Sequence, residues 1–385
     1  MKLEDIKHVA VVGAGEMGHS IAEVCLISGF TVFMYDIKEE FVERGKNRID
    51  WSLQKLAEKA RISQSDPEMF MANLTITVDL EEAVKNADLV IEAAPEDLEL
   101  KKKIFANLDK LTPKHSILAS NTSNMSITEI GNATNRPEKV CGMHYFNPPV
   151  LMQLIEIVKG DKTSDETIKL MSEFTTKCRK IAIISKDSPS FIVNRLLGAS
   201  VLWFQLMLDR NEYPPEKIDA AVMNAGIYMG PYEMADFLGL DVIYHSMKYL
   251  EERLSKEHAP TSTLEKLVKE NKLGKKTREG IYKWPEVGRP EIDTSDPADF
   301  DVMGQYKLMI NEAAKVLEEG VGTAKDIDIG MKFGLGIPWG PFELAEDTDL
   351  AELTIFLDEQ ADKYDKETFR AHKWIRDGTL MDHVK

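Results

Sequence analysis

The stretch HVAVVGAGEMG, residues 8–18, decides the fold. It begins as a short apolar run and ends among glycines, which is typical of a buried parallel strand followed by a tight turn. The next stretch, residues 17–28, places apolar side chains on one helical stripe, and TVFMYD, residues 31–36, has the composition of a second strand. The sequence therefore predicts a strand–helix–strand unit with a glycine-rich turn at its first junction.

The glycine spacing gives this turn a chemical meaning. Gly13 permits the tight turn, Gly15 lets the backbone approach a pyrophosphate, and Gly18 allows the strand and helix to pack closely. Asp36 ends the second strand, where a carboxylate accepts hydrogen bonds from ribose hydroxyls and repels a 2′-phosphate. The pattern predicts a site for NAD, and Lys38 nearby keeps NADP open. The alternative is an ordinary glycine turn with a surface aspartate.

Strands and helices continue to alternate through the first half of the chain. Further strand-like runs occupy residues 73–78, 88–94, 116–121, 139–146, 154–158 and 180–185. A charged helical excursion lies near residues 38–70. This alternation predicts an α/β domain of the Rossmann type, doubly wound around a mostly parallel sheet and covering residues 1–186.

The second half of the chain reads as helical and contains an internal repeat. The tetrapeptides GPYE, residues 230–233, and GPFE, residues 340–343, lie in similar surroundings. An Ile-Asp pair precedes each of them. We therefore predict an all-α C-terminal region made of two repeated helical domains, with a first copy over residues 187–290 and a degenerate second copy over residues 300–385.

Composition excludes several classes of protein. The 385 residues suggest more than one domain, and 65 acidic against 48 basic residues give a net charge of −17. This excess argues against a general binder of nucleic acid or anionic membranes. The three cysteines are far apart, which indicates neither a zinc site nor a disulfide framework. No signal peptide or membrane span is recognisable, so we expect a cytoplasmic protein without a bound metal.

His144 and Glu156 are the strongest candidates for chemistry. His144 lies near the end of one strand-like run, and Glu156 is an acidic residue inside the apolar run LIEIV, residues 154–158. A hairpin turning at Asn147-Pro148-Pro149 would place the two side chains opposite each other. A carboxylate beside an imidazole fixes its tautomer and makes it a general base. The alternative is a structural histidine at a strand end.

Three further groups have both a functional and a structural interpretation. Ser123 follows the fifth strand and Asn194 begins the helical half, so each could hydrogen-bond a substrate oxygen. Both residue types also favour turns and helix starts, and capping is the alternative. Lys55 and Lys59 belong to a basic cluster on the helical excursion. The cluster could hold the phosphates of a nucleotide-tailed substrate, or it could be a solvated helix face.

Taken together, the ordered motifs resemble the 3-hydroxyacyl-CoA dehydrogenases. The matching segments are GAGEMG, EAAPEDLELKKKIF, SNTSN, MHYFNPP, LIEIV, DSPSFIVNR and MGPYE. They cover the N-terminal domain and the first helical copy nearly end to end. The duplicated helical region resembles the dehydrogenase part of fusions with enoyl-CoA hydratases, although no hydratase-like segment is recognisable here.

The resemblance implies roles for individual residues. His144 corresponds to the catalytic base, Glu156 to its partner, and Ser123 and Asn194 to groups that contact the reacting oxygen. Lys55 and Lys59 fall where the family clamps CoA. The positions expected to contact NAD are Gly13, Gly15, Glu16, Met17, Gly18, Asp36, Glu96, Lys101 and Asn147.

The sequence thus predicts reversible NAD-dependent oxidation of an (S)-3-hydroxyacyl-CoA, such as 3-hydroxybutyryl-CoA, to a 3-ketoacyl-CoA. Three alternatives stay open. The first is a dehydrogenase of a free hydroxy acid, the second is a catalytically silent NAD-binding or structural protein, and the third is the β-hydroxyacid dehydrogenase group that uses a lysine. The second helical copy could pack on the first and make a monomer, and a homodimer is the other possibility.

Overall fold

The computed structural model describes residues 1–384. It divides into two compact units. One contains residues 1–191 together with residues 321–340, and the other contains residues 192–320 and the chain from residue 341 onward. Each unit has its own topology and its own buried core.

An eight-stranded sheet organises the first unit. The strand order is β3-β2-β1-β4-β5-β6-β7-β8, and every neighbouring pair is parallel except β6 and β7. All eight strands coincide with runs predicted from the sequence, and β7 and β8 each extend one residue further. Their bounds are β1 His8–Val12, β2 Thr31–Tyr35, β3 Leu74–Thr77, β4 Leu89–Glu92, β5 Ile117–Ser120, β6 Val140–Tyr145, β7 Leu154–Lys159 and β8 Ile181–Lys186.

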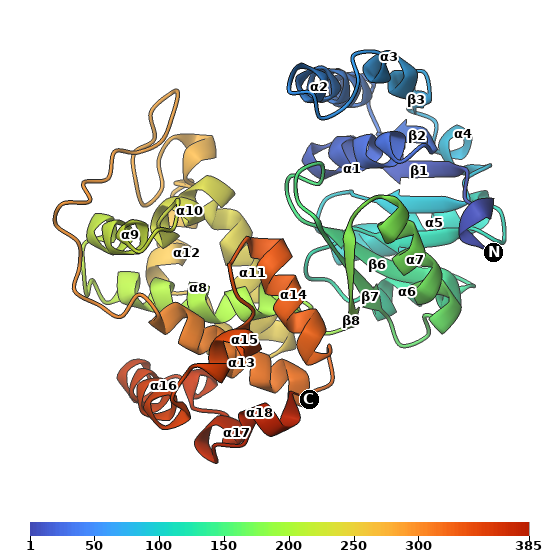
Figure 1. Ribbon diagram of the computed structural model, residues 1–385. Coiled ribbons are helices and arrows are strands. Elements are labelled where there is room, and N and C mark those ends of the chain that lie inside the picture. The colour runs from blue at the N-terminus through green and yellow to red at the C-terminus, as the bar shows by residue number, and fades with distance from the viewer. Residues whose placement is uncertain (385) are drawn as a thin grey trace. The chain divides into compact units, whose positions relative to one another are not determined.

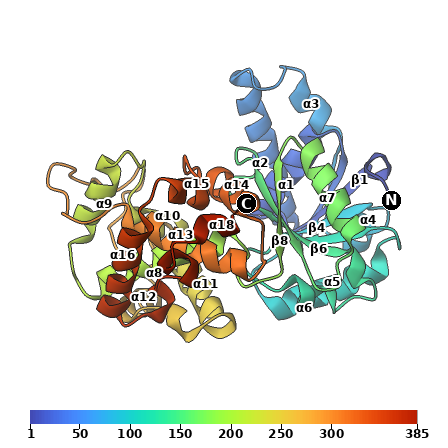
Figure 2. The same ribbon diagram turned by 60° about the horizontal axis from the view of Figure 1, so that its bottom comes forward.

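Helices cover both faces of this sheet, as a doubly wound domain requires. One core packs α1, α2 and α7 against the sheet, and a second core packs α4, α5 and α6 against the other face. Figure 2 shows α1 and α7 on one side of the strands and α5 and α6 on the other. The bounds are α1 Glu16–Ile27, α2 Glu39–Glu58, α3 Asp66–Met71, α4 Leu80–Val84, α5 Leu98–Leu111, α6 Ile127–Gly131 and α7 Asp165–Lys177. Short 3₁₀ turns occupy Leu3–Asp5 and Pro137–Lys139.

The charged excursion after β2 forms α2 and α3, which lie beyond β2 and β3 in Figure 1. The helix α2 is amphipathic: Val42, Ile49 and Leu53 are fully buried, and most of its charged residues are exposed. The buried stripe packs this helix on the domain core. Its polar side is therefore available to form the wall of a groove.

The helix α14, Ala324–Leu335, lies within the predicted second helical copy, residues 300–385. By its contacts it groups with the compact unit that contains the sheet. It packs against β7 and β8, and the Lys186 N–H donates to the Val321 carbonyl at 2.7 Å. Because β8 is an edge strand, its outer backbone groups have no neighbouring strand, and this contact satisfies one of its N–H groups.

The second unit is helical. The helices α8 and α13 pack against each other, and Arg195 of α8 reaches Glu312 of α13 at 2.9 Å. The bounds are α8 Val193–Asp209, α9 Pro215–Asn224, α10 Pro231–Leu238, α11 Leu240–Arg253, α12 Ser262–Lys269, α13 Gly304–Glu318, α15 Pro341–Glu346, α16 Leu350–Tyr364, α17 Lys373–Arg376 and α18 Leu380–His383, with 3₁₀ turns at Lys256–His258, Lys275–Thr277 and Glu367–Phe369. None of the helices within residues 1–384 combines the length and apolar character needed to cross a bilayer.

The Ile-Asp pairs explain why the repeated tetrapeptides begin with glycine. The carboxylate of Asp219 accepts the N–H groups of Tyr232 and Glu233, at 2.9 and 2.8 Å, and so caps α10. A Cβ at Gly230 would fall 2.3 Å from the Asp219 side chain, and a Cβ at Gly340 would fall 2.2 Å from that of Asp328. The same close approach in both copies requires a residue without a side chain.

Candidate active site

The glycine-rich turn has the geometry that its spacing predicts. Gly13 has a φ of +111°, and a Cβ there would lie 2.6 Å from the Ala93 carbonyl oxygen. A Cβ at Gly18 would lie 1.9 Å from the Gly13 carbonyl oxygen, which shows how closely α1 approaches the turn. Nothing lies within 4 Å of the corresponding position at Gly15. The open space over Gly15, at the N-terminus of α1, fits the pyrophosphate of a dinucleotide.

Asp36 lies just after β2, as predicted, and it also holds the turn. Its Oδ2 accepts the Ala14 N–H at 2.8 Å and its Oδ1 accepts the Ile37 N–H at 2.7 Å. Each carboxylate oxygen has capacity for a second hydrogen bond. The side chain can therefore accept ribose hydroxyls while its backbone contacts stay in place, so the residues present fit NAD.

His144 and Glu156 form a buried pair. They lie directly opposite each other on the antiparallel strands β6 and β7, which confirms the predicted hairpin register. The His144 Nδ1 lies 3.1 Å from Glu156 Oε2, and the two residues are 4% and 0% exposed. Phe146 and Phe191 flank the imidazole, with ring centroids 4.5 and 6.0 Å away. Because a carboxylate only accepts, this contact favours the neutral tautomer with its proton on Nδ1 and its lone pair on Nε2.

The residues after β5 are tied to those near β4 and β6. Glu96 Oε1 accepts the Ser123 N–H at 2.7 Å and the Thr122 hydroxyl at 3.1 Å. Asn121 Oδ1 accepts the Tyr145 N–H at 2.9 Å, next to His144 in the chain. The structure thus connects Ser123 and Glu96 at the carboxyl ends of the central strands, which is where open α/β sheets bind their ligands.

Lys101, which the resemblance places among the residues that contact NAD, has three protein oxygens around its ammonium. It is 1% exposed, and its ammonium donates to these oxygens. Its Nζ lies 2.7 Å from Glu92 Oε1, 3.1 Å from the Ala94 carbonyl and 3.3 Å from Glu96 Oε2. An ammonium has three N–H donors, so these oxygens account for all of them. In this arrangement Lys101 positions Glu96 and the loop after β4.

Glu92 was missed by the sequence analysis. It is fully buried at the end of β4, where Oε1 takes the Lys101 ammonium and Oε2 accepts the Ser120 hydroxyl at 2.6 Å. The signal was available: an acidic residue inside the apolar run DLVIEAA, residues 88–94, is as unexpected as Glu156 in its own strand. A buried carboxylate needs a hydrogen-bonded or oppositely charged partner, and Lys101 is that partner for Glu92.

A groove lies between α1, α2 and the turn after β6. Its volume is about 710 Å³. The predicted residues Glu16, Lys55, Lys59 and Asn147 all line it, so the structure brings the expected CoA lysines together with two residues expected to contact NAD. Other lining residues include His19, Ser20, Glu23, Arg48, Trp51, Ser52, Val150 and Leu151. Lys55 pairs with Glu58 at 2.7 Å on the same helix.

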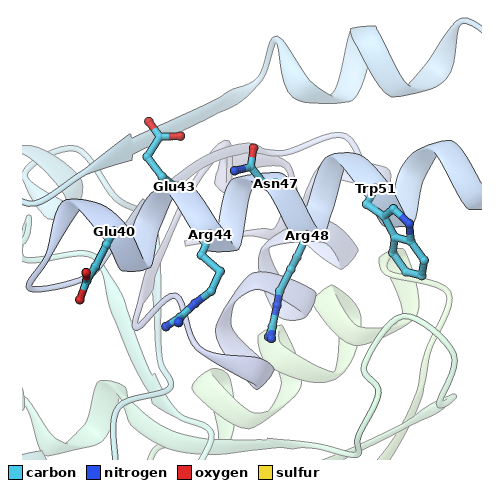
Figure 3. A pocket seen from close by; sticks show the side chains of 6 residues that line it. All are labelled: Glu40, Glu43, Arg44, Asn47, Arg48 and Trp51. Atoms are coloured by element: carbon cyan, nitrogen blue, oxygen red, sulfur yellow. The ribbon is translucent and has the colours of Figure 1, made fainter. Parts of the chain in front are cut away.

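A shallower pocket of about 420 Å³ continues along the outer side of α2. Figure 3 shows Arg44, Arg48 and Trp51 extending to one side of this helix, while Glu43 and Asn47 point the other way. Arg48 donates to Glu16 Oε2 at 2.6 Å, which links α2 to the first turn of α1. Arg48 and Trp51 line both this pocket and the groove, so the two form one continuous surface.

Lys180 holds the turn that borders the groove, and the sequence analysis assigned it no role. Its ammonium donates to the carbonyls of Pro149, Val150 and Met152, at 2.7, 3.3 and 2.7 Å. Burial lowers the pKa of Lys180. A lysine at the start of an apolar strand was a weak signal, because its carbonyl partners are main-chain atoms that no sequence pattern marks.

The remaining predicted residues are found on separate elements. Met17 lies in the first turn of α1, half-buried. Asn194 lies in the first turn of α8 and belongs to the helical unit, whereas His144, Glu156 and Ser123 belong to the sheet unit. Within residues 1–384 no group of three histidine, cysteine or acidic side chains is arranged to hold a metal ion.

Comparison with known proteins identifies the family. The model of the 3-hydroxyacyl-CoA dehydrogenase NAD-binding domain matches residues 8–188, and that of the C-terminal domain of the same family matches residues 191–284 and 306–383. A probable 3-hydroxybutyryl-CoA dehydrogenase of Bacillus subtilis is 39% identical over 285 residues, covering 73% of this chain and 99% of that protein.

Two further relatives span nearly the whole chain. The crystal structure of 3-hydroxybutyryl-CoA dehydrogenase from Escherichia coli K12 has a TM-score of 0.87 and 27% identity, covering 98% of this chain and 99% of that one. The fatty acid oxidation complex subunit alpha of Idiomarina loihiensis is 32% identical over 374 residues, covering 89% of this chain and 51% of that protein. The chain belongs to the 3-hydroxyacyl-CoA dehydrogenase family of NAD-dependent oxidoreductases.

Proposed function

We propose that the protein catalyses the reversible, NAD-dependent oxidation of a short-chain (S)-3-hydroxyacyl-CoA to the corresponding 3-ketoacyl-CoA. The observation that carries this proposal is the buried His144–Glu156 pair, joined at 3.1 Å across β6 and β7 in the domain with the glycine-rich turn. The short acyl chain follows from two of the relatives, which are named for 3-hydroxybutyryl-CoA.

In this mechanism His144 is the general base. Glu156 accepts a hydrogen bond from Nδ1–H and fixes the orientation of the ring. The lone pair of Nε2 is then available to the substrate. Nε2 removes the proton of the substrate hydroxyl, and the positive charge that develops on the imidazole is stabilised by the adjacent carboxylate. Low exposure of both residues excludes water and strengthens this interaction. In the reverse direction the imidazolium returns the proton to the ketone oxygen.

NAD, when bound, accepts a hydride from the carbon that carries the hydroxyl. The turn at Gly13–Gly18 and the N-terminus of α1 bind its pyrophosphate, and Asp36 binds the adenosine ribose. Glu96 and Ser123, joined at 2.7 Å, lie at the strand ends where the nicotinamide half is expected. We assign to Ser123 and Asn194 the hydrogen bonds that hold the reacting oxygen.

Lys55 and Lys59 provide the contacts for CoA. Both line the groove beside α1, and their positive charges complement the phosphates of the CoA nucleotide in an otherwise acidic chain. This feature separates the proposal from a dehydrogenase of a free hydroxy acid, which would have no phosphates to place there.

The test is NADH consumption with acetoacetyl-CoA, compared with free acetoacetate. The proposal expects turnover of the CoA ester and little or none of the free acid. Equal turnover of both would favour a free hydroxy acid substrate. Binding of NADH without turnover of either would favour a catalytically silent protein and contradict the proposal.

A further inference from the structure

A buried carboxyl group in the groove between α1 and α2 lacks part of its hydrogen bonding. Glu23 of α1 lines the groove and is 1% exposed. Ser52 of α2 faces the same groove, and its hydroxyl lowers the pKa of the Glu23 carboxyl group, against the larger effect of burial. Its Oε1 atom has no hydrogen-bond partner among residues 1–384. A buried polar atom without a partner is destabilising. Other described residues also bury such atoms, Glu233 Oε1 among them, but of these residues Glu23 is the one that lines this groove.

The surroundings of Glu23 indicate what kind of ligand this is. Arg48 and Lys55 line the groove and are each half-exposed, so they can meet an anionic end. Trp51 and Leu151 also line it and are 66% and 69% exposed, which gives it an apolar rim. An elongated molecule with phosphates at one end and an apolar, amide-bearing body fits this combination. The pantetheine arm of a CoA ester has these properties.

We propose that Glu23 is a positioning residue for the acyl-CoA substrate, and that its protonated carboxyl group donates a hydrogen bond through Oε1 to an amide carbonyl of the pantetheine arm. This inference rests on the proposed function, because it takes a CoA ester as the occupant of the groove. The proposed mechanism does not use Glu23, and the hydrogen bond changes how tightly the substrate is held without entering the proton or hydride transfer.

The inference has a pH signature. Burial raises the pKa of Glu23 to about 7 from its ordinary value of 4.5, and the hydrogen bond with Ser52 opposes this rise. Below that pKa the carboxyl group is protonated and can donate to an amide carbonyl. Above it the group is a buried anion that can only accept, so the hydrogen bond to the carbonyl is lost. We therefore expect the KM for the CoA ester to increase as the pH rises through about 7.

Other titratable and charged groups face the same groove and have to be separated from Glu23. They are Glu16 and His19 on α1 and Arg48, Lys55 and Lys59 on α2. The turn at residues 147–151 adds none, because it consists of asparagine, two prolines, valine and leucine. Burial lowers the pKa of His19, so the imidazole stays neutral near pH 7. The phosphates of CoA also titrate, and this contribution is the same for every variant.

The experiment compares the pH dependence of KM for acetoacetyl-CoA in three proteins, from about pH 6 to about pH 8.5. Glu23→Gln keeps the size and donor capacity of the protonated side chain but cannot ionise. Glu68→Gln is the matched control, because Glu68 is exposed on α3. The wild type and Glu68→Gln should show a several-fold increase in KM with pH, whereas Glu23→Gln should show a flatter profile. The difference should fall on KM more than on kcat.

Two further measurements make the outcome decisive. Ser52→Ala removes the hydrogen bond that lowers the Glu23 pKa, so the midpoint of the KM profile should move to higher pH. Calorimetric binding of free CoA, which carries the same arm, gives the pH dependence of affinity without turnover. Parallel profiles in the wild type and Glu23→Gln, by KM and by calorimetry, would overturn the inference. Absence of turnover with CoA binding that still depends on Glu23 would instead overturn the proposed function alone.

Discussion

Two regions of the sheet domain contain buried glutamates, and these glutamates differ in how completely they are hydrogen-bonded. At the strand ends, Glu92 has Lys101 and Ser120 as partners, and Glu156 has His144. In the groove between α1 and α2, Glu23 is equally buried but leaves Oε1 without a partner. The strand ends are therefore organised before any ligand arrives. In the proposed complex the substrate supplies the hydrogen bond that Glu23 lacks in the groove.

This difference matches the two tasks proposed for the regions. Chemistry needs groups that hold their positions when charge develops, since reorganisation during the reaction is costly. Substrate binding can use a group whose hydrogen bonding is completed only in the complex. Substitutions at the strand ends should therefore impair catalysis or stability strongly, and substitution of Glu23 should have a smaller effect.

Replacing Glu156 removes the negative charge beside the catalytic imidazole. For Glu156→Gln we expect kcat to fall by about 10²–10⁴-fold, because the imidazolium that forms during oxidation loses its stabilising partner. Steady-state kinetics with 3-hydroxybutyryl-CoA and NAD measure the effect. Glu166→Gln, on the exposed side of α7, is the control and should retain wild-type kcat. A Glu156→Gln enzyme with near wild-type kcat would show that the pair is structural.

Replacing Lys101 breaks the organised cluster at the end of β4. Lys101→Met leaves the buried Glu92 carboxylate without its cation, and loss of one partner from a buried ion pair costs about 3–5 kcal/mol. Urea unfolding should report this decrease in stability. Lys103→Met on the same helix is the control, because Lys103 is exposed. Adding Glu92→Gln to Lys101→Met should restore part of the loss; additive losses would mean that the two side chains are not coupled.

Replacing Glu23 should have a small, pH-dependent effect on the protein without ligand. The folded-state pKa of about 7 lies above the ordinary value of 4.5, so this group favours folding most below 4.5, and that contribution is lost as the pH rises through about 7. Glu23→Gln should therefore match the wild-type Tm near pH 4.5 and exceed it above pH 7. A Tm difference between Glu23→Gln and the wild type that does not change with pH would show that the pKa of Glu23 is not raised in the folded protein.

The sheet was predictable because its signals are local. Each strand is an apolar run bounded by turn residues, and the hairpin at Asn147-Pro148 set the register that pairs His144 with Glu156. The position of α14 was not predictable in the same way. Its sequence resembles that of the first helical copy, but which surface it covers is decided by the exposed edge strand β8, and that is a tertiary effect.

Parts of the candidate site were also beyond local reasoning. The positions of Gly13, Asp36 and His144 in the fold follow from motif spacing and strand order. The protein contacts of Lys101 could not be predicted in this way, because the three oxygens that accept its hydrogen bonds are brought together only by folding. The missing hydrogen-bond partner of Glu23 Oε1 could not be predicted either. It depends on which side chains come within hydrogen-bond distance of that atom in the folded protein.

The most direct test of the account is the rate of 3-hydroxybutyryl-CoA oxidation by His144→Ala, measured in a single turnover with the NAD affinity of the same preparation. The account predicts that oxidation slows by about 10²–10⁴-fold while NAD binds as in the wild type, because the glycine-rich turn follows β1 and Asp36 follows β2, whereas His144 lies on β6, with β4 and β5 between. Oxidation at the wild-type rate by a variant that still binds NAD would contradict His144 as the base.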